Sequence, residues 1–161
     1  MAELGSYRGG VAKLICELKS PATELHLFDT WEGLPFSSGE EPLWKKGNFA
    51  APFDEVRSYL GVYKNVFFHK GVFPETAAPV KNKKFSLVLI DFDLGECIKD
   101  ALEFFYPRMK KGGFIVVHDY GVSGCRGTRA CEVKRAVDGF FEDKPEIVLK
   151  VNDAQALIQK V

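Results

Sequence analysis

Residues 85–121 read FSLVLIDFDLGECIKDALEFFYPRMKKGGFIVVHDYG, and this stretch decides the fold. Two short apolar runs, 85–91 and 113–118, lie on either side of a longer amphipathic run at 96–109. This alternation is typical of strands that cross over through helices into a mostly parallel sheet. The stretch therefore predicts an α/β fold.

The same alternation extends along the rest of the chain. It predicts further strands at 24–29, 65–69, 147–151 and 155–159, and further helices at 10–18, 52–60 and 128–141. The last two strands are separated only by a short turn, so they are expected to form an antiparallel hairpin at one edge of the twisted sheet, which carries helices on both faces.

The length and the start of the chain limit its organisation. With 161 residues, a single domain over 1–161 is expected. Only two residues precede Glu3, where a first strand is expected to end, whereas a central strand needs about five or six. The first strand is therefore predicted to be short or truncated, and an upstream segment is expected to be missing.

Composition excludes several classes of function. The 22 basic and 22 acidic side chains balance, so nucleic acid is not an expected partner. No apolar run reaches the roughly 20 residues of a membrane-spanning helix, and no signal peptide is present, so a cytoplasmic protein without a membrane partner is expected. The 14 phenylalanines favour some exposed apolar surface and hence a homo-oligomer.

A glycine-rich turn follows the first predicted strand. The sequence ELGSYRGG at 3–10 would let the backbone approach a ligand, although a tight turn without a ligand explains it equally well. Asp29 ends the next strand, where a carboxylate can accept hydrogen bonds from ribose hydroxyls. No G-x-G-x-x-G pattern is present, which favours a cofactor with one nucleoside and no pyrophosphate.

Acidic and imidazole side chains gather where two predicted strands end. Because parallel strands present their carboxyl ends at one edge of the sheet, Asp91, Asp93, His118 and Asp119 are expected to lie close together. Clustered carboxylates repel one another unless a positive charge lies between them, so a divalent cation is predicted. The alternative for Asp93 is that it caps the following helix.

Other conspicuous residues have simpler explanations. His26 and His69 lie within or at the end of a strand, so packing is favoured over ligation for both. Trp31 and Trp44 either cover a ligand or pack a long loop.

Five segments, in order along nearly the whole chain, carry a resemblance to a known family. They are ELGSYRGG, LHLFDTWEGLP, HKGVFPET, the 85–121 stretch and KRAVDGFF. Together they resemble the macrocin O-methyltransferase (TylF) family of class I S-adenosylmethionine-dependent methyltransferases. The resemblance implies a Rossmann-like fold and an enzyme of natural-product biosynthesis. Such an enzyme would transfer a methyl group, with help from Mg²⁺, to a hydroxyl of a sugar or an aromatic small molecule.

The resemblance also implies roles for individual residues. S-Adenosylmethionine would be bound by Glu3, Gly5, Tyr7, Gly9, Asp29 and Thr30. The metal would be held by Asp91, His118 and Asp119, with Asp91 also counted as catalytic and Asp93 as the general base.

Two residues depart from the family pattern. His118 stands where the family has an aspartate, and imidazole suits Mn²⁺, Fe²⁺ or Zn²⁺ better than Mg²⁺, so Mn²⁺ or another ion is an alternative. Gly95 replaces a large aromatic residue, which implies a wider substrate pocket. Two other functions stay open, namely a cofactor-binding or interaction module of this fold that has lost catalysis, and a D-x-D phosphatase.

Overall fold

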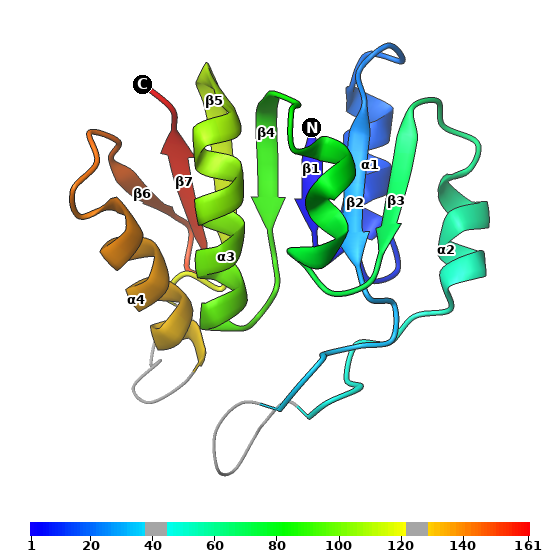
Figure 1. Cartoon of the computed structure of the whole chain (residues 1–161), viewed down its shortest axis with the longest axis horizontal. Helices are drawn as coiled ribbons and strands as arrows, with labels where there is room; N and C mark the ends of the chain where they lie inside the picture. Colours follow the sequence, from blue (N-terminus) through cyan, green and yellow to red (C-terminus); the bar gives the residue numbers. More distant parts are fainter. Residues whose placement is uncertain (38–44, 122–128) are drawn as a thin grey trace. The chain divides into compact units, whose positions relative to one another are not determined.

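The computed structural model describes residues 1–37, 45–121 and 129–161 (Figure 1). The strands are β1 (Ala2–Leu4), β2 (Leu25–Asp29), β3 (Val66–Lys70), β4 (Phe85–Ile90), β5 (Met109–His118), β6 (Val148–Val151) and β7 (Gln155–Gln159). The helices are α1 (Gly10–Leu18), α2 (Phe53–Leu60), α3 (Gly95–Phe105) and α4 (Arg129–Phe141), with 3₁₀ turns η1 (Glu75–Val80) and η2 (Tyr106–Arg108). Trp44 lies outside the described residues.

The seven strands form one mixed sheet in the order β3-β2-β1-β4-β5-β7-β6. The pairs β2–β3 and β4–β5 are parallel, whereas β7 pairs antiparallel with both β5 and β6. The predicted α/β fold and its antiparallel C-terminal hairpin are therefore confirmed. The first strand is short, as predicted, and all three of its residues are buried.

Two compact units make up the chain. The first comprises Met1 and Glu3–Ala78, and the second comprises Ala2 and Pro79–Val161. The single domain expected from the length stays a prediction.

In the first unit, two helices pack against one face of β2. Leu25 and Leu27 of this strand are fully buried against apolar side chains of α1 and α2. The other members of this cluster are Ala12, Cys16, Trp31, Ala51, Val56 and Leu60. The loop that follows β2 is thereby tied to the core through Trp31.

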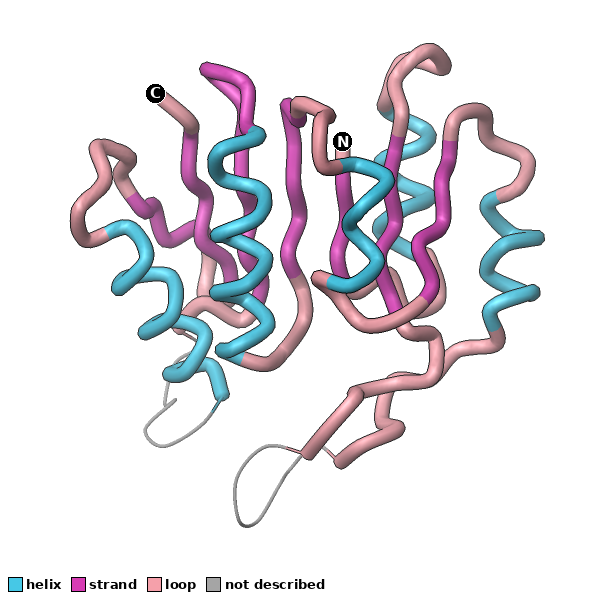
Figure 2. The backbone as a smooth tube through the Cα atoms, in the orientation of Figure 1, coloured by secondary structure: helices cyan, strands magenta, loops and turns pink. Residues whose placement is uncertain are grey.

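In the second unit, α3 and α4 lie on the same side of the strands (Figures 1 and 2). The strand residues buried on one face alternate as a pleated sheet requires, and they are Val88, Ile90, Ile115, Val117, Ala156 and Ile158. The opposite face keeps exposed apolar side chains, with Phe114 37% and Leu149 54% exposed. The homo-oligomer expected from the sequence stays a prediction.

The boundary between α3 and β5 differs from the expectation. The predicted helix at 96–109 ends as α3 at Phe105 and continues only as η2, because Pro107 has no amide hydrogen to donate to the carbonyl group four residues earlier. The strand predicted at 113–118 begins earlier, at Met109, which pairs with Phe85 before a register shift. Most other boundaries agree within one residue.

No helix among the described residues is long and apolar enough to cross a membrane.

Candidate functional site

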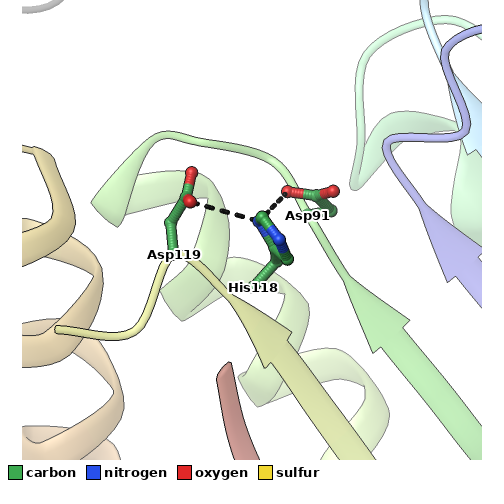
Figure 3. Close-up of side chains that lie close together, drawn as sticks. All are labelled: Asp91, His118 and Asp119. Atoms are coloured by element: carbon green, nitrogen blue, oxygen red, sulfur yellow. Dashed lines mark ion pairs between the residues drawn. The ribbon is translucent and has the colours of Figure 1, made fainter. Parts of the chain in front are cut away.

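The residues predicted to bind a metal lie at the carboxyl ends of two neighbouring strands in the second unit. Ile90 of β4 is in register with Val117 of β5, so Asp91 and His118 come next on adjacent parallel strands. Asp119 follows with a left-handed backbone (φ +57°), which turns the chain directly after the strand. Figure 3 shows the imidazole of His118 between the two carboxylates.

The distances within this group are short. His118 Nδ1 lies 3.3 Å from Asp91 Oδ1 and 3.1 Å from Asp119 Oδ1. One candidate ligand atom from each of the three residues can be chosen so that all lie within 4.8 Å of one another. All three side chains are between 34% and 38% exposed, so the group is accessible from solvent.

The electrostatics of the group follow from this geometry. Hydrogen bonds from the imidazole to Asp119 and Asp91 raise the pKa of His118 to about 10, against the opposing effect of partial burial. A protonated His118 therefore neutralises part of the carboxylate charge. When the proton leaves, a nitrogen ligand faces two carboxylate ligands, and this donor set suits Mn²⁺, Fe²⁺ or Zn²⁺ better than Mg²⁺.

Asp93 lies in the turn between β4 and α3. Its backbone is left-handed (φ +60°), and α3 begins at Gly95 with Leu94 as the N-cap residue and no side-chain capping bond. The residue at the N-cap position is thus Leu94, and not Asp93. Among the described residues, the possible metal-binding group does not include Asp93, so its assignment as general base stays a prediction.

The predicted cofactor residues lie in the first unit, where Asp29 organises the glycine-rich turn. One oxygen of Asp29 accepts a hydrogen bond from the amide of Tyr7 and the other from the amide of Trp31, both at 2.7 Å. Burial raises the pKa of Asp29, while these backbone hydrogen bonds oppose the shift. Backbone hydrogen bonds from Ser6 and Thr30 also oppose the shift, so amides of the glycine-rich turn and of the following loop hold the Asp29 carboxylate, and its binding to ribose hydroxyls stays a prediction.

The glycines of this turn serve different purposes. Gly5 has a left-handed backbone (φ +85°) and donates its amide hydrogen to Phe28 O at 2.8 Å, which ties the turn to β2. A Cβ on Gly9 would lie 3.0 Å from Leu60 Cδ1, so packing against α2 already accounts for that glycine. Beside Gly10, by contrast, a Cβ would meet no atom within 4 Å, which leaves open space at the start of α1.

Glu3 and Thr30 are placed less directly for binding. Glu3 is only 2% exposed on β1. The hydroxyl of Thr30 donates to Gly33 O at 2.7 Å and accepts from the amide of Glu32 at 3.1 Å, so it stabilises its own loop. Their contribution to cofactor binding stays a prediction.

Trp31 and His26 are packing residues in the structure. For Trp31, packing was one of the two expectations from the sequence, and for His26 it was the favoured one. Trp31 is 3% exposed, and its indole donates to Tyr7 O at 3.0 Å, which fastens the loop after β2 to the glycine-rich turn. His26 is likewise buried and lies 3.0 Å from His69 through ring nitrogens. The sequence carried no signal for the Trp31–Tyr7 contact, because only the fold brings these residues together.

The space beside Gly95 is already filled in part. A Cβ at this position would lie 3.1 Å from Glu132 Cβ and 3.3 Å from the Glu132 backbone carbonyl group of α4. A side chain at position 95 would therefore crowd α4, and the wider pocket expected from the sequence stays a prediction.

The architecture defines a class of protein. The structure matches that of the O-methyltransferase NovP with a TM-score of 0.82 at 20% identity, over 100% of this chain and 71% of that chain. It also matches Aeropyrum pernix fibrillarin in complex with S-adenosyl-L-methionine, with a TM-score of 0.59 at 18% identity, over 99% of this chain and 65% of that chain. The fold is that of the class I methyltransferases.

The chain belongs to the macrocin O-methyltransferase (TylF) family, whose family model matches residues 1–147. A related protein is the 8-demethyl-8-(2,3-dimethoxy-alpha-L-rhamnosyl)-tetracenomycin-C 4'-O-methyltransferase of Streptomyces olivaceus. The two are 27% identical over 142 residues, which cover 78% of this chain and 54% of the relative. The chain thus spans about half the length of this curated relative. The family match confirms the resemblance and gives no support to a D-x-D phosphatase.

Proposed function

We propose that this protein is an S-adenosylmethionine-dependent O-methyltransferase that acts, with a divalent cation, on a hydroxyl of a sugar or aromatic small molecule. The observation that carries the proposal is the convergence of Asp91, His118 and Asp119 at two strand ends of a chain that belongs to the macrocin O-methyltransferase family. The relative named for methylation of a rhamnosyl group favours a sugar acceptor. A cytoplasmic location remains part of the proposal on sequence grounds.

The residues of each unit have separate tasks in this proposal. S-Adenosylmethionine would supply an already activated methyl group, and a cation held by Asp91, His118 and Asp119 would lower the pKa of the acceptor hydroxyl. In the first unit, Asp29 would orient the cofactor through its ribose hydroxyls, with Tyr7 and Trp31 holding the carboxylate in place.

In the second unit, Asp93 would accept the proton of the acceptor hydroxyl as the oxygen attacks. A well-placed general base contributes about 10²–10⁴-fold to the rate. By holding the cation, Asp91 and Asp119 would align the acceptor oxygen for in-line transfer of the methyl group. This alignment is the largest task left to the protein.

Calorimetric titration with S-adenosylhomocysteine, with and without Mg²⁺ or Mn²⁺, tests the two sites separately. We then expect Asp91→Ala to abolish methyl transfer to a rhamnosylated acceptor while the affinity for S-adenosylhomocysteine changes less than about threefold, since Asp91 lies in the second unit. Asp100→Ala, an exposed carboxylate of α3, is the matched control and should retain activity. A normal rate for Asp91→Ala would disprove the cation site.

A binding module without catalysis is the second candidate, and His118 in place of a family aspartate is the observation that favours it. Binding of S-adenosylhomocysteine without methylation of any acceptor in a panel of sugars and phenols would support this candidate.

A further inference from the structure

Tyr120 connects the proposed cation site to α4. It follows Asp119 directly, is 6% exposed, and donates its hydroxyl hydrogen to Asp138 Oδ1 at 2.6 Å. Lys134 pairs with the same carboxylate, donates to Tyr120 Oη at 3.4 Å, and has its Nζ 5.1 Å from the centre of the tyrosine ring. A tyrosine, an acid and a lysine thus form one cluster, called here the Tyr120 clamp.

The backbone on either side of Asp119 is held as well. The amide of Tyr120 donates to Ala154 O at 3.0 Å, in the turn between β6 and β7. Lys150 donates to Gly121 O at 2.7 Å. The turn that carries Asp119 is therefore attached to α4 by a side chain and to the β6–β7 hairpin by its backbone. Asp119 has a left-handed backbone (φ +57°), a conformation that persists only where the surrounding structure holds it. The direction of the Asp119 side chain therefore depends on these attachments.

We infer that Tyr120 is a positioning residue, which fixes the Asp119 carboxylate beside His118 through its bond to Asp138 on α4. This inference rests on the proposed function for the cation, although the position of Asp119 can be measured without one. Partners that orient metal ligands typically contribute about 10- to 100-fold to metal affinity.

The second unit contains a matched control. Tyr106 of η2 donates its hydroxyl hydrogen to Glu146 Oε2 at 2.9 Å, Lys160 pairs with Glu146, and Lys160 Nζ lies 4.5 Å from the ring centre of Tyr106. This second clamp also combines a tyrosine, a carboxylate and a lysine, but Tyr106 precedes β5, whereas His118 ends that strand. A general loss of stability should therefore be similar for Tyr106→Phe and Tyr120→Phe, and only the second should affect the cation site.

The test measures Mn²⁺ binding by electron paramagnetic resonance for the intact chain and its variants. We expect Tyr120→Phe and Asp138→Ala each to weaken Mn²⁺ binding about tenfold, the double variant to weaken it no further, and Tyr106→Phe to bind as the unmodified chain does. Asp138→Asn retains an acceptor for the tyrosine hydroxyl and should stay within about threefold. Equal affinity for Tyr120→Phe and the unmodified chain, or equal losses for Tyr120→Phe and Tyr106→Phe, would overturn the inference.

A second readout keeps this inference separate from the proposed function. The ¹H–¹⁵N signals of the His118 ring, recorded without metal, should move in Tyr120→Phe and stay in place in Tyr106→Phe. If the unmodified chain binds no Mn²⁺, the proposed cation site fails while the ring signals still decide the role of Tyr120. Unmoved ring signals in Tyr120→Phe would contradict the positioning role whether or not Mn²⁺ binds.

Discussion

His118 is the residue at which this chain departs most clearly from the pattern expected of its family. Its imidazole lies within 3.3 Å of Asp91 and 3.1 Å of Asp119, so it is placed to act either as a cationic partner or as a nitrogen ligand. A carboxylate at the same position would offer only oxygen. The preference for one metal over another should therefore depend on this side chain.

We predict that His118→Asp shifts the metal preference toward Mg²⁺. Mg²⁺ prefers oxygen ligands, whereas imidazole nitrogen suits Zn²⁺. Three carboxylates in place of two carboxylates and an imidazole should therefore raise the ratio of Mg²⁺ to Zn²⁺ affinity, on the order of tenfold. Competition titrations of the two metals measure this ratio. His118→Asn, which is neutral and lacks the imidazole, is the control for loss of nitrogen ligation. An unchanged ratio in His118→Asp would argue against ligation by His118.

Cys97 on α3 offers a prediction from a shifted pKa. Burial first, then the nearby charges of Asp100 and Glu96, raise the pKa of its thiol to about 11. At pH 8 the thiolate fraction is then roughly 200-fold lower than for an ordinary thiol with a pKa of about 8.5, and the thiolate is the reactive form. Alkylation of Cys97 by iodoacetamide, followed by peptide mass spectrometry, should be slower by about that factor in the folded chain.

The rate should increase as pH rises toward 11, and in urea Cys97 should react as an ordinary thiol does. Rapid alkylation of the folded chain at pH 8 would show that the local environment of Cys97 differs from this structure.

At the scale of elements, the turn between β1 and α1 contains one glycine that packing requires and one that it does not. Gly9 has a left-handed backbone (φ +79°) and leaves no room for a side chain beside Leu60. Gly10 begins α1, and a Cβ there would meet open space. The first glycine is required by packing, whereas the second is not.

We predict that Gly9→Ala lowers the free energy of unfolding by about 1–3 kcal/mol, since alanine is strained at positive φ and its Cβ would crowd Leu60. Gly10→Ala should be neutral or stabilise the chain by up to about 1 kcal/mol, because alanine favours the helix. Urea unfolding followed by circular dichroism measures both. Equal effects of the two substitutions would contradict this distinction.

At the scale of the whole molecule, the open question is whether the two compact units unfold together. Each unit has a buried or partly buried cysteine, Cys16 on α1 in the first and Cys97 on α3 in the second. Trp31 is buried in the core of the first unit, so its fluorescence reports on that unit.

We predict a single cooperative transition, as expected for one domain of 161 residues. In a urea series, tryptophan fluorescence, pulse labelling of Cys16 and pulse labelling of Cys97 should give the same midpoint. The two cysteines are labelled in the same sample, and mass spectrometry distinguishes their peptides. A difference between their unfolding midpoints therefore cannot come from a difference in protein concentration. A lower midpoint for one cysteine would mean that the units unfold independently.

The sequence predicted that a helix and a strand follow β4, but not where α3 ends and β5 begins. The helix at 96–109 was predicted too long because its apolar spacing continues through Tyr106 and Met109, while Pro107 prevents a regular helix there. The start of β5 was placed late because its first residues, Met109 and Lys110, pair across an irregular register that apolar spacing does not indicate.

The sequence by itself determined the α/β class, the antiparallel hairpin and the candidate site residues at the strand ends, because each depends on local periodicity and on where polar residues end an apolar run. Only the tertiary structure decided that His118 lies between two carboxylates, that Gly9 is needed for α2, and that Tyr120 reaches Asp138. Apart from His118 and Asp119, which are neighbours in sequence, these contacts join residues that are distant along the chain, and only packing and strand register bring them together.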